Sequence, residues 1–440
     1  MQLYHREIII TLSAEENPSL IGFKREIIAH LLPGEIPVRF AITKTIDKSY
    51  HCDVDVVNEI EDRLDDCNNF NIFTYSPRKF EDTSEFIAVL LIPTGIGAEI
   101  GGHAGDGGAL AKFMASSCDK LITHPNVVNA SDINDLPDNG LYVEGSVISE
   151  LMMGNLALQE VRANRILLIT EPREDKNITD MSVNTVSAVR ASIGIDCIGI
   201  AELPNSLKME HSYSESGCAI GNVDHLETLF DMINHYRGQY DAVALHTRVN
   251  VSSSICNEYF RSGGKMVNPW GGVEAMLTHL LALTLGVPVA HAPMVMSIEE
   301  ATASFGIVDP RISAEVVSAC FLICVLKGLH KSPRIIRDLS LIGQSELISS
   351  SDISCLIIPD GCVGIPTLAA LEQGIPVIAV RENRNQMRND LTDYPFESGK
   401  LFIVDNYLEA AGVMNALRAG VTVDSVRRPL SSTTILNYHV

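Results

Sequence analysis

Short, continuously apolar segments alternate with amphipathic segments along most of this chain. From residue 86 onward, the apolar segments have strand-forming composition, end abruptly in Gly, Pro, His or Asp, and precede segments with helical periodicity. Strands that are apolar on both faces belong to parallel sheets that helices cover on both sides. We therefore expect an α/β fold of mainly parallel sheets in Rossmann-like layers. The predicted strands are 86–92, 120–123, 141–143, 165–170, 196–200, 241–245 and 288–290, and the predicted helices are 109–117, 184–193, 224–236 and 272–285.

The length of 440 residues predicts more than one domain. Residues 1–85 have the pattern of a small α+β unit, interpreted as a cap, lid or oligomerisation element, with strands at 7–13, 38–46 and 50–57 and a helix at 19–32. Residues 86–340 form the predicted main α/β domain, which ends with a long apolar helix at 313–329. Residues 341–440 form the predicted C-terminal α/β unit, with strands at 355–358, 376–380 and 401–404 and helices at 367–373 and 407–419.

The charge and the cysteines limit the classes of partner. The net charge of −22 argues against binding to nucleic acid or to an anionic membrane surface, both of which require clustered Lys and Arg. The ten cysteines include no C-x-x-C pair, and the first residues do not resemble a signal peptide, so we expect a reducing, cytoplasmic location. The apolar stretches at 275–285 and 315–326 fit either a domain core or the interface of a homo-oligomer.

A Gly-rich loop at residues 93–108, PTGIGAEIGGHAGDGG, is the strongest candidate for a ligand site. Glycines let a backbone turn tightly and let a ligand approach its amides, and a following helix start attracts anions. The spacing is G-x-G-x-x-x-G, which disfavours NAD because the dinucleotide fingerprint is G-x-G-x-x-G. The alternative is a tight loop that serves packing alone. The residues predicted to bind ligand here are Thr94, Gly95, Gly97, Gly101 and Gly102, and those predicted to be catalytic are His103 and Asp106.

Three apolar segments each end at a histidine: His124, His246 and His291. We expect the three segments to be strands of one sheet. Carboxyl ends of parallel strands form the ligand-binding edge of a sheet, so these imidazoles are candidates for acid/base catalysis. They are equally candidate ligands for a divalent zinc, iron or manganese ion, and the alternative is a structural role for each. Glu144 follows a predicted strand, and Glu274 lies at the start of a predicted helix. Both are candidate bases or metal ligands.

Two further loops contain candidate ligand-binding residues. Asn268, Gly271 and Gly272 surround the only tryptophan, and Asn126 follows His124. The segment 356–367, LIIPDGCVGIPT, is similar to 90–102, LLIPTGIGAEIGG, and contributes Asp360, Gly361 and Thr367, with Thr367 expected to cap a helix; Arg381 follows the next strand. This layout resembles the nucleotide-sugar half-site of two-domain glycosyltransferases and related epimerases, and the alternative is a solvated arginine-rich loop.

The segments LITHPNVVNA (121–130), NPWGGVEAMLTHL (268–280), AHAPM (290–294) and IPDGCVGIPTLAALEQGIPVIAV (358–380) resemble a bacterial and plant family of unknown function, DUF3326. The resemblance extends over residues 86–390. It implies kinship and carries no activity, cofactor or site residue.

Together these features favour a cytosolic enzyme that acts on a small anionic metabolite by acid/base or metal-assisted chemistry. Lyase or isomerase chemistry is favoured over redox chemistry because the sequence contains no cofactor fingerprint. Two alternatives stay open. One is a nucleotide-sugar transferase or epimerase, and the other is a non-catalytic ligand-binding or assembly protein, in which the histidines would share no site.

Overall fold

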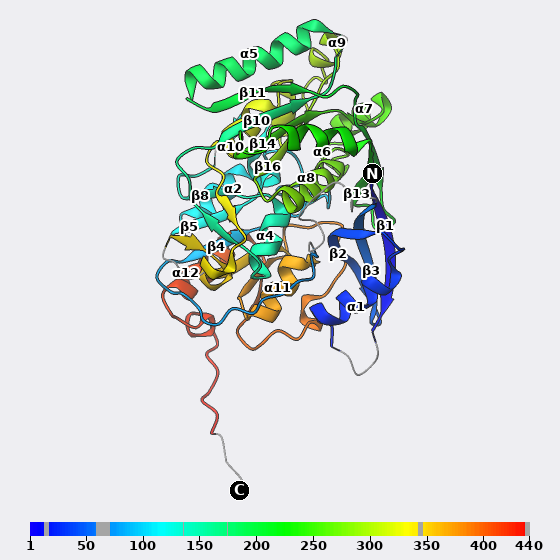
Figure 1. The fold of residues 1–440 in the computed structure, drawn as a ribbon. Helices are drawn as coiled ribbons and strands as arrows, with labels where there is room; N and C mark the ends of the chain where they lie inside the picture. The colour runs from blue at the N-terminus through cyan, green and yellow to red at the C-terminus, as the bar shows by residue number, and fades with distance from the viewer. Residues whose placement is uncertain (13–16, 59–70, 135, 174, 342–345, 436–440) are drawn as a thin grey trace.

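The computed structural model of this chain describes residues 1–12, 17–58, 71–134, 136–173, 175–341 and 346–435, and it confirms the α/β class (Figure 1). Two parallel sheets and one mixed sheet account for most of the strands. Residue 13, the predicted end of the first strand, and residues 342–345, beside the predicted boundary at 340, lie outside the described residues.

The six-stranded parallel sheet has the order β22-β21-β19-β4-β5-β8. Its strands are β4 (Ile87–Leu90), β5 (Lys120–Thr123), β8 (Gly140–Tyr142), β19 (Ile353–Pro359), β21 (Val377–Val380) and β22 (Leu401–Val404). Helices α2 (Gly108–Ala115), α11 (Ile365–Gln373) and α12 (Tyr407–Arg418) pack on its strands, and α4 (Gly145–Met152) packs against α11. The order of strands reverses between β4 and β19, and such a switch point is where open parallel sheets bind ligands. The two similar sequence segments, 90–102 and 356–367, are the loops on either side of it.

The four-stranded parallel sheet has the order β11-β10-β14-β16. Its strands are β10 (Arg165–Thr170), β11 (Asp196–Glu202), β14 (Ala242–Thr247) and β16 (Val289–Pro293). The helices associated with this half of the chain are α5 (Lys176–Ser192), α6 (Leu226–His235), α8 (Gly271–Leu285) and α10 (Leu322–His330). Helix α8 contacts both β16 and strands of the mixed sheet, so it forms part of the core between these two sheets (Figure 1).

The mixed sheet joins the N-terminal segment to two distant parts of the chain, in the order β15-β12-β13-β1-β3-β2-β20. Its strands are β1 (Gln2–Thr11), β2 (Ile36–Ile46), β3 (Ser49–Asn58), β12 (Lys208–Tyr213), β13 (Ala219–Asp224), β15 (Val249–Asn250) and β20 (Val363–Gly364). Helix α1 (Leu20–His30) covers one face, where Phe23 packs against Phe40 and Tyr50.

Strand pairing crosses both predicted domain boundaries. In the six-stranded sheet β19 lies directly beside β4, so residues 341–440 do not form a sheet of their own. In the mixed sheet β1 pairs with β13, and β2 pairs with β20. The boundaries at 85 and 340 therefore do not separate independent sheets, because the partner of a strand is not encoded by its neighbours in sequence.

The predicted long helix at 313–329 is wrong. A short helix η2 (Ser313–Val316) and α10 are separated by a break at which Phe321 adopts a left-handed φ of 51°. The remaining elements are β6 (Asn129–Ala130), β7 (Ile133–Asn134), β9 (Ala157–Gln159), β17 (Arg334–Ile336), β18 (Leu347–Ile348), α3 (Pro125–Val128), α7 (Ser253–Arg261), α9 (Ile298–Ala301), η3 (Leu339–Leu341), η4 (Ser350–Asp352), η5 (Leu391–Asp393) and η6 (Val423–Val426).

Within the described ranges, none of the helices combines the length and the apolar character that crossing a bilayer requires.

Candidate active site

Segments that follow strands of both parallel sheets meet around the Gly-rich loop. The loop follows β4, and its His103 Nδ1 lies 2.8 Å from the hydroxyl of Tyr259 in α7, which comes after β14. The amide of Ala104 donates to Glu315 Oε1 at 2.6 Å, and Glu315 lies in η2, which comes after β16. The loops at the carboxyl ends of the two sheets thus build one buried polar group, the Glu315 cluster, formed by His103, Asp106, Tyr259, Asn268 and Glu315.

The Tyr259 hydroxyl links a carboxyl group to an imidazole. It lies 2.9 Å from Glu315 Oε1 and 2.8 Å from His103 Nδ1. A phenol has one proton, so it can donate to only one of these two atoms at a time. When Tyr259 donates to the Glu315 carboxylate, His103 Nδ1 must donate to Tyr259. When Glu315 is protonated and donates to Tyr259, the phenol is free to donate to His103. The three groups form a hydrogen-bonded chain whose donors and acceptors can be arranged in either direction.

Burial shifts the acidities of this cluster toward neutral pH. Burial raises the pKa of Glu315 to about 8, although hydrogen bonds from Ala104 and Tyr259 oppose the rise and the charge of Asp106 adds to it. Burial also raises the pKa of Asp106 to about 7, against the opposing hydrogen bond from Gly101 N at 2.7 Å. Burial and the nearby Arg311 lower the pKa of His103, which keeps the imidazole neutral. Carboxyls with such pKa values can donate a proton at neutral pH.

Asp106 has one oxygen without a partner. Its Oδ1 accepts from Gly101 N, while its buried Oδ2 has no hydrogen-bond partner among the residues that the structure describes. A buried oxygen of this kind costs free energy unless it is protonated or meets a ligand. Asp106 is therefore the member of the Glu315 cluster with capacity for a further polar contact.

Glu274 extends the cluster toward the four-stranded sheet. Its charge raises the pKa of Glu315, and its Oε1 lies 3.2 Å from His291 Nδ1, although these two atoms are not aligned as a hydrogen bond. His291 Nε2 lies 2.8 Å from the Thr247 hydroxyl. The structure thus places four of the predicted catalytic residues in or beside one region: His103, Asp106, Glu274 and His291.

The other predicted catalytic residues lie elsewhere. His124 Nε2 accepts from Ile92 N at 3.2 Å, and burial lowers the pKa of this imidazole to about 4. Glu144 caps α4 by accepting from Ser146 N at 2.7 Å, and its Oε1 lies 2.6 Å from His279 Nδ1. Burial acts to raise the pKa of Glu144, but His279 and Ser146 lower it, so Glu144 is a carboxylate.

The three strand-end histidines do not share one site. His124 ends a strand of the six-stranded sheet, whereas His246 and His291 lie in the four-stranded sheet. His291 is in register with Leu245, so the side chain of the next residue, His246, points to the opposite face of that sheet. There Arg173 donates to His246 Nδ1 at 3.3 Å. The expectation of a single sheet was wrong, and among the described residues these imidazoles form no metal-ligating group.

Protein atoms occupy much of the Gly-rich loop. A Cβ added at Gly102 would lie 2.0 Å from the Ala98 carbonyl oxygen, and Gly101, at φ 80°, packs against Ile92. The amide of Gly101 donates to Asp106 and that of Ala104 to Glu315, so these two amides are already used within the protein. Packing therefore explains several of the glycines, and the anion-binding role of this loop stays a prediction.

The remaining predicted ligand-binding residues of this region hold loops together. Asn126 Nδ2 donates to Gly101 O at 2.7 Å, and Asn268 Oδ1 accepts from the amides of Trp270 and Gly271 at the start of α8. A Cβ at Gly271 would lie 2.7 Å from Thr94 Cγ2; those at Gly272 and Gly95 would meet Ala219, and that at Gly97 would meet Val267. These residues lie close to one another because the loops pack against each other.

The arginine-rich segment lines a surface groove of about 780 Å³ at the carboxyl ends of β21 and β22. Arg381 lies 3.4 Å from Asp405, and Arg384 lies 3.2 Å from Glu99. Burial raises the pKa of Asp360, which accepts from the amide of Gly361. Thr367 does not cap the helix: Gly364 is the N-cap of α11, and the buried Thr367 hydroxyl donates to Cys362 O.

Sequence reasoning missed Tyr259 and Glu315, which complete the cluster. Glu315 adjoins an apolar stretch that has the pattern of a helix. Its carboxyl therefore looks like an exposed charge at the end of that helix and not like a buried group. An isolated acidic residue at the edge of a strongly apolar segment is the only sequence signal for it. Tyr259 has no such signal, because nothing in the sequence distinguishes it from a core tyrosine.

The comparisons with known proteins concern kinship. The chain is 31% identical over 338 residues to a protein of Synechococcus sp. described as an uncharacterized lipoprotein, and the match covers 76% of this chain and 91% of that protein. No solved structure matches the chain. The family model described as "Protein of unknown function (DUF3326)" matches residues 87–427, which extends the sequence resemblance beyond residue 390. The chain therefore belongs to the DUF3326 family.

Proposed function

We propose that this chain is an enzyme that transfers protons to and from a small anionic metabolite, as a lyase or an isomerase does. The observation that carries the proposal is the position of the Tyr259 hydroxyl between Glu315 and His103. A buried carboxyl with a pKa of about 8 can give up a proton near neutral pH, and a neutral imidazole can receive one through the phenol.

The surroundings of the Glu315 cluster support a substrate with polar groups. Asp106 offers a buried oxygen without a partner among the described residues, and Arg311, which pairs with Glu99 at 2.9 Å and with Asp309 at 3.0 Å, lies beside the Gly-rich loop. The cluster lies where the carboxyl-end loops of two parallel sheets meet, and such edges are the usual position of α/β active sites. The scatter of His124, His246 and His291 is what a non-catalytic binding protein predicts, so the proposal depends on the Glu315 cluster and not on those histidines.

Proton exchange tests the proposal directly. The full-length protein is incubated in D₂O with a panel of small hydroxy acids, oxo acids and sugar phosphates, and loss of carbon-bound protons is followed by NMR. Wild type is expected to exchange a proton of one compound, and Glu315→Gln and Tyr259→Phe to lower that rate about 100-fold or more. Glu160→Gln, a surface carboxylate paired with Lys120, is the matched control and should retain the rate. Equal rates in wild type and Glu315→Gln would contradict the assignment.

The groove lined by Arg381 and Arg384 favours the second candidate, a nucleotide-sugar transferase or epimerase. The groove lies at the carboxyl edge of the six-stranded sheet, near the switch point, and guanidinium groups suit a diphosphate. A uridine diphosphate should then raise the Tm of the wild type, and Arg381→Ala should abolish the shift. No shift in the wild type would exclude this candidate.

A cytoplasmic location is also part of the proposal. The cysteines that the structure describes are all free thiols, which agrees with a reducing compartment. The Synechococcus relative is called a lipoprotein, which favours attachment to a membrane as the alternative. Fractionation of cells that produce the full-length chain separates these outcomes: recovery in the soluble fraction supports the proposal, and recovery with membranes contradicts it.

A further inference from the structure

The polar face of the mixed sheet contains a second group of ionisable residues, which lies outside the Glu315 cluster. Strands β1 and β3 are antiparallel, and their register places His5 opposite Asp55 and Glu7 opposite Asp53. Residues two apart on a strand point to the same face, so the four side chains share one face of the sheet. On the far side of β3, Arg39 of β2 is in register with Asp55.

One nitrogen of His5 is already engaged. His5 Nδ1 lies 2.8 Å from Asp55 Oδ1, and Asp55 Oδ2 pairs with the Arg39 guanidinium. A carboxylate that pairs with a guanidinium is an acceptor, so Nδ1 carries the proton and donates it. In the neutral form of the imidazole, Nε2 then carries a lone pair. A histidine fixed by a carboxylate through one nitrogen is the usual arrangement for metal ligation through the other.

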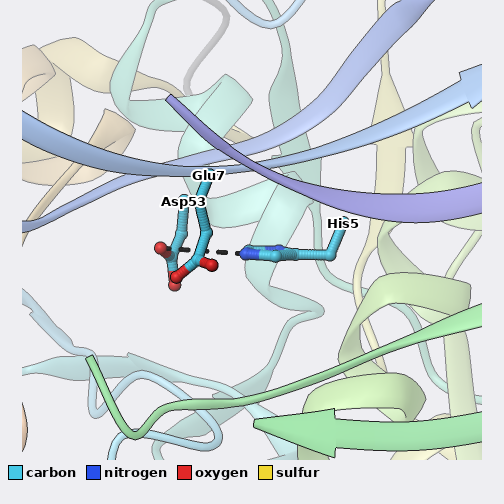
Figure 2. A group of neighbouring side chains, drawn as sticks. All are labelled: His5, Glu7 and Asp53. Atoms are coloured by element: carbon cyan, nitrogen blue, oxygen red, sulfur yellow. Dashed lines mark ion pairs between the residues drawn. The ribbon is translucent and has the colours of Figure 1, made fainter. Parts of the chain in front are cut away.

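The free nitrogen points at two carboxylates. The His5 side chain is only 6% exposed, and its buried Nε2 has no hydrogen-bond partner among the described residues. Figure 2 shows the ring edge directed at the adjacent carboxylates of Asp53 and Glu7, with Nε2 3.8 Å from Asp53 Oδ1. One ligand atom from each of the three residues lies within 4.8 Å of the others. Ligands at about 2.1 Å from a shared ion lie about 3–4 Å apart, so small side-chain movements would close this group around a cation.

The carboxyl groups of Asp53 and Glu7 also favour the binding of a cation. Arg39 neutralises Asp55, while the ion pairs described for Asp53 involve only the imidazole of His5. Glu7 Oε1 accepts from the amide of Glu215 at 2.7 Å, which holds the carboxylate beside the sheet without neutralising it. Asp53 and Glu7 thus place two carboxyl groups beside His5 Nε2, and one divalent ion would balance the charge of two carboxylates.

We propose that His5, Glu7 and Asp53, the His5 cluster, form a binding site for a divalent transition-metal ion. One imidazole and two carboxylates suit Mn²⁺, Zn²⁺ or Fe²⁺ better than Mg²⁺, which prefers oxygen ligands alone. Three protein ligands leave coordination positions open for water or an anionic ligand, and Glu7 lies on the exposed rim of the group. This site does not rest on the proposed function, because none of its residues belongs to the Glu315 cluster.

The position of the His5 cluster connects it with the switch point of the six-stranded sheet. Asp53 is in register with Ala41, and Ala41 pairs with Gly364 in the loop that follows β19. An ion at the His5 cluster would therefore lie two strands from one of the two loops that border the switch point, in the same sheet.

Metal titration of the full-length protein tests the site. The protein is treated with EDTA, freed of the chelator, and titrated with Mn²⁺ while free Mn²⁺ is followed by electron paramagnetic resonance; Zn²⁺ is then added as competitor. Wild type should bind about one Mn²⁺ per chain. His5→Gln, Glu7→Gln and Asp53→Asn should each weaken binding about 10-fold or more. His211→Gln and Asp224→Asn, on strands β12 and β13 of the same sheet, are the matched controls and should bind as wild type does.

Two results would overturn the site. One is a wild type that binds no Mn²⁺ or Zn²⁺ below about 1 mM, which would leave His5 as the partner of an ion-pair network. The other is equal binding by wild type and Glu7→Gln. Glu7 is exposed and outside the core, so this variant should fold even if Asp53→Asn does not, and circular dichroism confirms that each variant is folded.

Discussion

The Glu315 cluster and the His5 cluster differ in how their buried ionisable groups are stabilised. In the Glu315 cluster, burial raises the pKa of two carboxyl groups, and a phenol and an amide both donate to Glu315 Oε1. In the His5 cluster, a guanidinium and an imidazole hold one carboxylate, and a buried nitrogen lone pair faces two others. The first arrangement favours protonated carboxyl groups, and the second leaves two carboxyl groups beside a nitrogen that has no hydrogen-bond partner among the described residues. The acid/base chemistry and the metal binding that we propose would thus lie in different parts of the molecule.

The largest expected difference between the clusters concerns folding. Glu315→Ala removes a fully buried carboxyl and leaves the Ala104 amide and the Tyr259 hydroxyl without their acceptor, so we expect it to lower the free energy of unfolding by about 3 kcal/mol. Glu7→Ala, on the exposed rim of the His5 cluster, should cost about 0.5 kcal/mol or less without metal. Urea unfolding of both variants measures the two free energies of unfolding, and equal losses would contradict the expected difference between the clusters.

The next effect is the dependence of stability on pH. The pKa of Glu315 rises from an ordinary value of 4.5 to about 8 in the folded chain, so the folded state retains a proton that the unfolded state releases. The stabilising contribution is complete below about pH 4.5 and is lost as the pH rises to 8. Between pH 6 and pH 8, wild type should lose about 2 kcal/mol more than Glu315→Gln. Glu160→Gln serves as control and should follow wild type. Parallel curves for wild type and Glu315→Gln would disprove the protonated carboxyl.

The His5 cluster should respond to metal where the Glu315 cluster does not. An ion that binds only the folded chain stabilises it by about 1.4 kcal/mol at ten times its dissociation constant. Thermal unfolding should therefore shift upward when Mn²⁺ is added to wild type or to Glu315→Gln, and should not shift for His5→Gln. If Mn²⁺ raises the unfolding temperature of His5→Gln as much as that of wild type, the ion binds at another site.

The smallest effect comes from the phenol that links the two ends of the proton chain. Tyr259→Phe keeps the ring contacts with Phe260 and Trp270 and removes only the hydroxyl, so we expect a loss of about 1 kcal/mol in stability. Because the hydroxyl donates to Glu315 and thereby lowers its pKa, its removal should raise the pKa of Glu315 further. A carboxyl NMR titration of the variant measures the direction of this shift. A lower pKa in Tyr259→Phe would contradict the geometry of the chain.

Local structure could be predicted from the sequence where the signal is continuous apolar composition. The bounds of β5, β10 and β22 agree with the predictions, and Ser19 caps α1 at the predicted start of that helix. The pairing of strands could not be predicted, because residues 2–4 meet 222–224 and residue 353 meets residue 87 through the tertiary fold alone. The break in the helix at Phe321 could not be predicted either, because nothing in an apolar stretch indicates a residue with left-handed φ.

The candidate sites show the same limit. His103 and Asp106 stand out in the sequence because glycines surround them, whereas Glu315 and Tyr259 are joined to them only by the approach of the two parallel sheets. The His5 cluster uses residues two apart on two strands, a spacing that is common in any solvated strand. Its meaning depends on the register of β1 with β3, which the sequence does not contain.

A pH titration of carboxyl groups by NMR, with ¹³C-labelled glutamate in wild type and in Glu315→Gln, measures the protonation of Glu315 directly. We expect a glutamate signal in wild type that titrates with a pKa of about 8 and is missing from the variant. If every glutamate signal that is lost in Glu315→Gln titrates below about pH 5, Glu315 is an ordinary carboxylate, and the proton chain through Tyr259 to His103 does not exist.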